Sequence, residues 1–194
     1  MPLLDRREFR WLNEPPEWSL AEDRLEVVTG GSTDFWRQTH YGFVRDSGHF
    51  FYREAAGDFT ATVRFHGDYE TLYDQAGLML RLDAETWIKA GIEYSDGVQN
   101  LSVVVTRGFS DWSVLPLNEA PDEVWLRVSR HGDAVRVEGS LDGIRYQMVR
   151  LAYLPPGVPV QVGPMACSPQ RSGFRVAFES FRIGEPISPE LHAG

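Results

Sequence analysis

The sequence lacks several features that mark well-known classes of protein. It has a single cysteine, Cys167, so an internal disulfide is excluded. No stretch approaches the roughly 18 consecutive apolar residues of a membrane-spanning helix. The first residues, MPLLDRREFRWLNEPPEW, lack the apolar run of a signal peptide. We therefore expect a soluble, cytoplasmic protein that has no membrane partner.

Positive charge is also scarce. Nineteen Lys and Arg residues stand against 28 Asp and Glu residues, which gives a formal net charge of -9 at pH 7. Nucleic acids and anionic membranes are bound through clusters of Lys and Arg. The composition thus argues against nucleic acid as a partner.

Helical periodicity is nearly absent, and short segments of alternating apolar and polar residues take its place. Between turn signals such as Asp-Gly, the sequence predicts strands at 25–29, 49–54, 59–67, 101–106, 124–130, 134–140, 158–166 and 174–184. A length of 194 residues with 42% hydrophobic content fits one compact domain. The pattern predicts an all-β fold and favours a β-sandwich or jelly roll, with a barrel as the alternative.

Residues 74–97 are the most informative segment, because they predict a hairpin whose two faces carry opposite chemistry. One face is apolar: Leu78, Leu80, Leu82, Ile88, Ala90, Ile92 and Tyr94. The other mixes polar, charged and aromatic groups: Gln75, Met79, Arg81, Trp87, Lys89 and Glu93. Successive side chains of a strand point to opposite sides of the sheet. We expect the apolar face to pack in the core and the mixed face to carry the function.

Several motifs, taken in order, carry a family resemblance. They are the aromatic run of residues 33–43, the hairpin of 75–94, LSVVVT, the triplet Asp111-Trp112-Ser113, SLDG, GPMACSP and FESFRI. Together they resemble the DUF1349 family, which includes a fungal enolase-regulating member and is placed in the concanavalin A-like lectin/glucanase superfamily. The resemblance extends over residues 11–184. It implies a concanavalin A-like jelly-roll β-sandwich of two antiparallel sheets with a concave face.

The same limits divide the chain into three parts. We expect an N-terminal extension at 1–10, a single jelly-roll domain at 11–184, and a short, poorly ordered C-terminal tail at 185–194.

The mixed face offers the groups that bind sugars, namely aromatic rings and planar polar side chains. In the hairpin register Gln75 and Glu93 should be opposite or diagonal neighbours, with Lys89 on the same face. We expect Lys89 to attract an anionic or hydroxyl-rich group. The predicted ligand-binding residues are Trp36, His40, Gln75, Lys89, Glu93 and Trp112, with Trp87 lining the same trough. The expected ligand is a carbohydrate or a sugar phosphate.

Each of these residues also has a purely structural interpretation. Lys89 and Glu93 would then be exposed charges of little energetic value, and the tryptophans would be packing groups, although Trp112 is expected in a loop between Gly108 and Pro116. His40 shares strand parity with Asp34, which permits an Asp-oriented imidazole. The alternative for His40 is a structural histidine held by a hydrogen bond.

Catalytic and cofactor motifs are missing, so the catalytic residues stay unknown. A glycoside hydrolase needs two carboxylates across the scissile bond, and the Glu-x-Asp-x-Glu pattern of the glucanases of this superfamily does not occur. There is no nucleophile elbow, Walker loop or dinucleotide fingerprint, so no cofactor is expected. No metal is expected either, since the histidines lack ligand spacing, although calcium at Asp74, Asp83 and Asp96 stays open.

Two functions other than sugar binding stay open. The enolase-regulating member implies a protein-interaction module that regulates a metabolic enzyme, which would then be the partner. A glycoside-active enzyme is the third interpretation, and a second carboxylate within reach of Glu93 would favour it.

Overall fold

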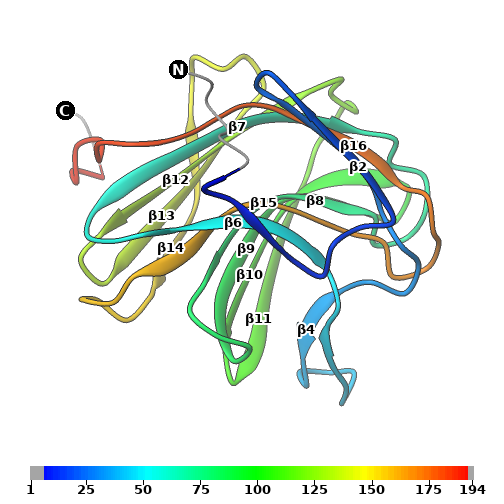
Figure 1. The fold of residues 1–194 in the computed structure, drawn as a ribbon, viewed down its shortest axis with the longest axis horizontal. Coiled ribbons are helices and arrows are strands. Elements are labelled where there is room, and N and C mark those ends of the chain that lie inside the picture. Colours follow the sequence, from blue (N-terminus) through cyan, green and yellow to red (C-terminus); the bar gives the residue numbers. More distant parts are fainter. Residues whose placement is uncertain (1–6, 192–194) are drawn as a thin grey trace.

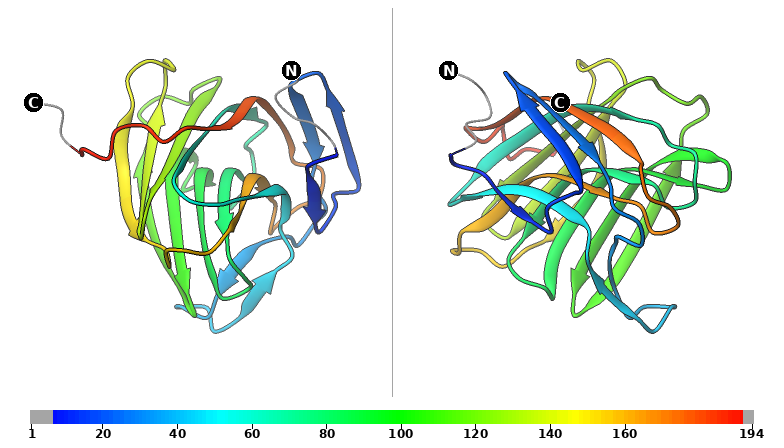
Figure 2. Two further views of the ribbon diagram at one scale, coloured as in Figure 1. Left: turned by 60° about the vertical axis from the view of Figure 1, so that its left-hand side comes forward. Right: turned by 45° about the vertical axis from the view of Figure 1, so that its right-hand side comes forward.

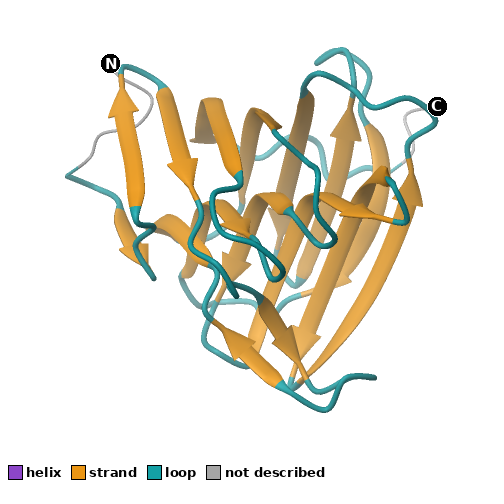
Figure 3. Ribbon diagram, turned by 90° about the vertical axis from the view of Figure 1, so that its right-hand side faces the viewer, coloured by secondary structure: helices purple, strands orange, loops and turns teal. Residues whose placement is uncertain are grey.

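The computed structural model describes residues 7–191, which form two large antiparallel sheets packed face to face (Figure 1). Within these residues the first sheet has seven strands, in the order β1 (Arg10–Leu12), β6 (His49–Ala55), β15 (Val160–Cys167), β8 (Gln75–Arg81), β9 (Thr86–Ser95), β10 (Val98–Arg107) and β11 (Phe109–Pro116). The second sheet also has seven, in the order β14 (Gln147–Tyr153), β13 (Ala134–Ser140), β12 (Val124–His131), β7 (Phe59–Gly67), β16 (Arg175–Gly184), β3 (Arg24–Val28) and β2 (Glu17–Ala21). The described chain contains no helix (Figure 3). The predicted all-β sandwich is confirmed, and the barrel alternative is wrong.

The main core lies between the two sheets. Leu78, Leu80, Ile88 and Ala90 point into it from β8 and β9, as the alternation predicts, and each is at most 2% exposed. Burying a Leu or Ile side chain contributes roughly 1.5–3 kcal/mol. These contacts fix which face of the first sheet is turned inward, and therefore which face is left for other chemistry.

A short two-stranded ribbon covers the opposite face of the first sheet. It consists of β4 (Phe35–Arg37) and β5 (Val44–Asp46), and in both views of Figure 2 it lies as a light-blue loop below the green strands. A second apolar cluster is buried where the ribbon meets the sheet: Phe35, Trp36, Phe50, Tyr52, Met79, Trp87, Val104, Met165 and Cys167. The β4–β5 ribbon therefore covers the mixed face of the hairpin.

The covering ribbon corrects the expectation for Trp87. Its side chain is 1% exposed, and its ring lies 6.1 Å from that of Phe35, centroid to centroid. Trp87 thus packs the ribbon onto the sheet and does not line a ligand trough.

Two glycines face each other in the middle of this surface. Gly77 of β8 pairs with Gly91 of β9, and Gly91 lies between Lys89 and Glu93 on the strand. A Cβ on Gly77 would lie 1.9 Å from the carbonyl oxygen of Ala90, and a Cβ on Gly91 would lie 2.0 Å from the carbonyl oxygen of Ala76. Only glycine fits this close approach of the two strands.

The two ends of the described chain contact the sandwich. Phe9 belongs to the main core, and β1 begins at Arg10, so the predicted extension contributes to the domain where it is described. Beyond β16, Arg136 donates to the carbonyl oxygens of Ser188 and Glu190. Residues 1–6 and 192–194 lie outside the described residues. No helix in the described part has the length and apolar character needed to cross a membrane.

Candidate functional site

A cavity of about 250 Å³ lies between the β4–β5 ribbon and the polar end of the β8–β9 pair. We call it the ribbon pocket. Its floor is formed by Asp34, Gln75, Lys89 and Glu93, and its walls by Trp36, Tyr41, Phe43, Tyr73, Trp112, Pro169 and Gln170. The cavity is smaller than the roughly 300–1,000 Å³ of drug-sized sites, so it suits a ligand the size of a single ring.

The strand register brings the predicted polar residues together. Gln75 lies directly opposite Glu93, and Lys89 lies opposite Met79 on the same pair of strands. The prediction that these three polar side chains share one place is confirmed by this register. Trp36 and Trp112 join them at the cavity wall.

The ammonium group of Lys89 is fully occupied by the protein. It donates to Oε1 of Gln75 at 2.7 Å, to the carbonyl oxygen of Phe35 at 2.8 Å and to Oδ1 of Asp34 at 3.2 Å. An ammonium has three protons to donate, and this side chain is 3% exposed. Lys89 therefore anchors the ribbon, and the expectation that it attracts an anionic or hydroxyl-rich group is wrong.

The charge of Lys89 is held in place by its neighbours. Burial lowers the pKa of the ammonium, but Asp34, followed by Cys167 and Glu93, raises it, and the net result is a pKa above the ordinary value. Lys89 is thus a cation at neutral pH. It is also the only lysine in the sequence, a signal that sequence analysis overlooked.

Asp34 is the functional residue that sequence analysis missed, because it was considered only as a partner for His40. Its Oδ1 accepts from Lys89, from the backbone N–H of Phe35 at 2.8 Å and from Nε2 of Gln75 at 3.3 Å. Asp34 is thus a second carboxylate beside Glu93 in the ribbon pocket. Its position next to the aromatic pair Phe35-Trp36 is the only hint that the sequence offers.

Glu93 is a buried carboxyl on the same floor. The residue is 4% exposed, and Oε2 accepts from the hydroxyl of Ser102 at 3.3 Å. Burial raises the pKa of Glu93, and Asp34 adds to the rise, while Lys89 and Ser102 oppose it, so the pKa lies above its ordinary value. This environment favours the protonated form of Glu93 more than water does.

Aromatic rings form the walls. The rings of Trp36 and Trp112 meet edge to face at a centroid distance of 6.4 Å, and Tyr41 stacks on Phe43 at 5.3 Å. Trp112 also donates from Nε1 to Ser102 at 3.1 Å, which links this wall to Glu93. Contrary to the predicted loop, Trp112 lies in β11, the edge strand of the first sheet, where it is 38% exposed.

A pair of tyrosines closes the rim. The hydroxyls of Tyr41 and Tyr73 lie 2.8 Å apart. This hydrogen bond, with burial and the nearby Glu93 and Asp96, raises the pKa of Tyr73 to about 12. The Tyr73 hydroxyl therefore stays protonated at neutral pH, and its hydrogen bond with Tyr41 joins the ribbon to the loop before β8.

His40 does not join the other predicted residues. It lies in the turn after β4 with a φ of 64°, so strand parity does not apply to it. It lines a neighbouring groove on the far side of Trp36 and Trp112. Asp34 is engaged with Lys89, and the Asp-oriented imidazole is wrong.

Asp74 organises the loop on the other side of the pocket. Its buried carboxylate accepts from Ser168 at 2.8 Å and from Arg171 at 2.6 Å, and also from the backbone N–H groups of Glu70 and Thr71. Pro169 and Gln170, which line the pocket, lie between two of these partners. Asp74 thus acts in loop structure, and no group of three or more metal-binding side chains occurs among residues 7–191.

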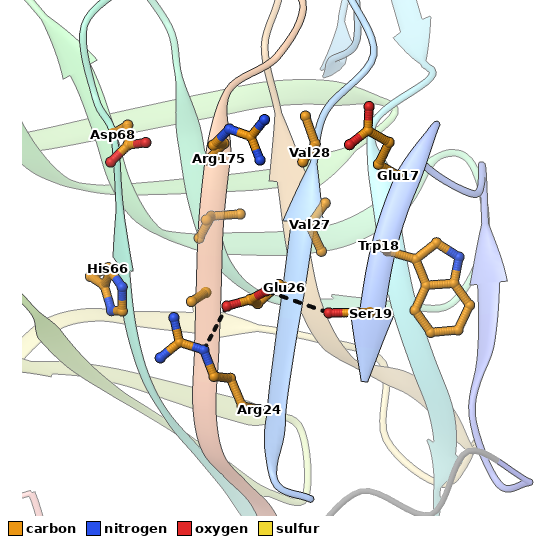
Figure 4. A pocket seen from close by; sticks show the side chains of 12 residues that line it. Glu17, Trp18, Ser19, Arg24, Glu26, Val27, Val28, His66, Asp68 and Arg175 are labelled. Atoms are coloured by element: carbon orange, nitrogen blue, oxygen red, sulfur yellow. Dashed lines mark hydrogen bonds and ion pairs between the residues drawn. The ribbon is translucent and has the colours of Figure 1, made fainter. Parts of the chain in front are cut away.

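A second groove, of about 400 Å³, lies on the second sheet (Figure 4). Three of its polar side chains pair with each other, since Arg24 donates to Glu26 at 2.8 Å and Ser19 donates to Glu26 at 3.5 Å. Trp18 is the only aromatic ring besides His66 in its lining. The groove lacks the enclosing rings of the ribbon pocket, which is therefore the better candidate site.

Cys167 allows a simple test of how firmly the β4–β5 ribbon covers the sheet. Its thiol is fully buried under the ribbon, and burial raises its pKa well above the ordinary value. Since the thiolate is the reactive form, we expect an aromatic disulfide reagent to label Cys167 only as fast as the protein unfolds. Rapid labelling of the native protein would show that the ribbon opens freely.

Comparison with known proteins adds family evidence. The family model described as "Protein of unknown function (DUF1349)" matches residues 11–186. The chain is 45% identical over 182 residues to "Regulation of enolase protein 1" of Saccharomyces cerevisiae, covering 94% of this chain and 92% of that protein. The resemblance found from the sequence motifs is confirmed.

Solved structures agree on the fold. A functionally unknown protein from Saccharomyces cerevisiae superposes with a TM-score of 0.90 at 44% identity, covering 94% of this chain and 98% of that one. A GH43 protein from Bacillus licheniformis gives 0.69 at 17% identity, over 94% of this chain and 37% of the other. A legume lectin-like domain from Entamoeba histolytica gives 0.63 at 11%, over 92% and 90%. The last two likenesses concern the fold alone.

Proposed function

Since the chain belongs to the DUF1349 family, whose description leaves the activity open, we propose from the geometry that the ribbon pocket binds a small carbohydrate-type ligand. One observation carries the proposal. A ring-sized cavity combines aromatic walls with a floor of hydrogen-bonding side chains, and such convergence in a concave site is the usual mark of ligand binding. Aromatic rings pack against the C–H faces of a sugar, and the floor orders its hydroxyls.

The floor also restricts the ligand's charge. Lys89 is saturated, while Asp34 and Glu93 present carboxyl oxygens to the cavity. A phosphate close to these oxygens would meet like charge, which costs several kcal/mol. We therefore favour a sugar without a phosphate group over the sugar phosphate that the sequence suggested.

A thermal-shift experiment tests this function. The protein is heated with a panel of mono- and oligosaccharides, sugar phosphates and calcium. A ligand at 100 times its Kd should add about 2.7 kcal/mol of stability, or about 5–10 °C in Tm for a chain of this size. Each shift is compared with the Tm of the same variant without ligand.

Variants locate the binding. Glu93→Gln should reduce the shift, because an amide replaces one carboxyl oxygen, and Trp112→Ala should remove most of it. Glu54→Gln, which changes an exposed glutamate on β6, serves as the matched control. If no sugar raises the Tm, or if all three variants behave like the wild type, the pocket is not a sugar site.

A second function is favoured by a different observation, the 45% identity to a protein named for regulation of enolase. Under this proposal the chain binds a metabolic enzyme and modulates it. Co-elution of the chain with purified enolase on gel filtration, and a change in enolase turnover, are the expected results. Independent elution with unchanged turnover would contradict it.

The third interpretation, a glycoside-active enzyme, is supported by two carboxyl groups, those of Asp34 and Glu93, that line the same pocket. The raised pKa of Glu93 is what a proton donor needs. Released reducing sugar in the panel, lost in Glu93→Gln, would support activity, and its absence would leave binding alone.

A further inference from the structure

The hydrogen-bonding capacity of the pocket floor is unbalanced. Every proton of the Lys89 ammonium is used, and Gln75 donates to Asp34. In contrast, within residues 7–191 no donor lies within hydrogen-bonding distance of Oδ2 of Asp34 or Oε1 of Glu93. Both oxygens can therefore accept hydrogen bonds from a ligand in the cavity.

The charge of the floor points the same way. Lys89 and Asp34 form an ion pair and cancel each other's charge. When Glu93 is ionised, it leaves one uncompensated negative charge. Among the described residues that line the pocket, there is no arginine, histidine or second lysine. The pocket thus favours a ligand that brings a positive charge to the carboxyl oxygens.

The walls suit a cation as well as a sugar ring. Trp36 and Trp112 stand at right angles, and Tyr41, Phe43 and Tyr73 complete the enclosure. A cation over an aromatic face is stabilised by roughly 0.5–2 kcal/mol, the larger values holding in desolvated sites. Nearby rings thus add to the attraction that the floor carboxyls exert on a positively charged group.

We propose that the ligand of the ribbon pocket carries a protonated amine on a single hydroxylated ring, as amino sugars do. The ammonium lies at the floor and donates to Asp34 and Glu93. The ring packs against Trp36 and Trp112. The inference rests on the proposed carbohydrate function and narrows it to a cationic member of that class.

The proposal carries a distinct pH dependence. The groups that face Glu93 are Lys89 on its own strand, Ser102 on β10, Asp34 on the ribbon side and Tyr73 on the rim; Cys167 lies close to the same charges. Of these, Glu93 is the one whose raised pKa brings its titration toward neutrality. An ammonium ligand needs the ionised carboxyl, so its affinity should rise with pH through the pKa of Glu93. A neutral sugar should show little of this rise.

Matched ligand pairs test the inference by isothermal titration calorimetry at constant chloride concentration. Glucosamine, galactosamine and mannosamine are each compared with their parent hexoses, and choline serves as an ammonium without a sugar ring. We expect at least one amino sugar to bind ten times more tightly than its parent hexose. Glu93→Gln should weaken the amino sugar at least tenfold and the hexose much less, while Glu54→Gln should change neither.

Each other outcome separates the two proposals. Equal binding of amino sugar and hexose, or equal weakening of both by Glu93→Gln, would overturn the amine and leave the carbohydrate site. Binding of choline alone would retain the ammonium and overturn the sugar ring. No binding by any of these probes would overturn both.

Discussion

Replacement of Lys89 by methionine is expected to lower the free energy of unfolding by about 3–5 kcal/mol, because it removes one partner of a buried ion pair and leaves Asp34 uncompensated. The ammonium is also the only link from the β8–β9 floor to the backbone of Phe35 among the side-chain hydrogen bonds described. Urea denaturation of the wild type and the variant measures the difference.

Two further variants serve as controls for the Lys89→Met result. Arg10→Met breaks an exposed ion pair with Glu54 and should cost no more than about 1 kcal/mol. Lys89→Met combined with Asp34→Asn removes both buried charges and should recover part of the loss. A loss for Lys89→Met as small as that for Arg10→Met would mean that the ribbon is not held by this ion pair.

The contribution of Lys89 should also depend on pH in a defined way. The folded-state pKa lies above the ordinary 10.5, so folding favours the protonated form. The stabilisation is then fully present below pH 10.5 and is lost as the pH rises through the higher folded-state value. At neutral pH, titration of Lys89 should therefore not change the difference in the free energy of unfolding between the wild type and Lys89→Met.

The second large effect is expected for Asp74→Ala. The carboxylate is fully buried and receives Ser168, Arg171 and two backbone N–H groups, so its removal leaves several donors unpaired at once. We expect a loss of about 3–5 kcal/mol in the free energy of unfolding. Differential scanning calorimetry should show a lower Tm with the same cooperative transition.

Asp83→Ala is the matched control for this change, since Asp83 lies in an exposed turn and accepts from the backbone of Glu85. It should cost about 1 kcal/mol or less. Because Pro169 and Gln170 line the pocket between Ser168 and Arg171, Asp74→Ala should also weaken any ligand of the ribbon pocket. A variant that is destabilised yet binds normally would show that this loop does not shape the site.

Much of the fold followed from local patterns. Alternation in residues 75–94 predicts both the hairpin and its two faces, because a strand has a strict period of two. The same register places Gln75 opposite Glu93. These are short-range relations, and the sequence contains them directly.

What covers a face is a long-range relation, and the pattern does not contain it. The ion pair of Lys89 joins residues 55 positions apart. The alternation of Trp87 and Lys89 gives no sign that a separate ribbon packs on them, so both were expected at an open surface. His40 was misplaced for a local reason, since its positive φ ends the strand parity on which its prediction depended.

The burial of the only lysine has a consequence for how the folded chain meets other proteins. Enzymes that attach acetyl groups or ubiquitin to lysine side chains need an accessible amine, and residues 7–191 offer none while Lys89 is covered. Loss of the ribbon would expose a single amine in the middle of the chain. A protease that cleaves after lysine would then cut only after Lys89, and the rate of cleavage would report how often the β4–β5 ribbon opens. We therefore expect lysine-modifying enzymes to act on Lys89 only after the ribbon has come away from the sheet.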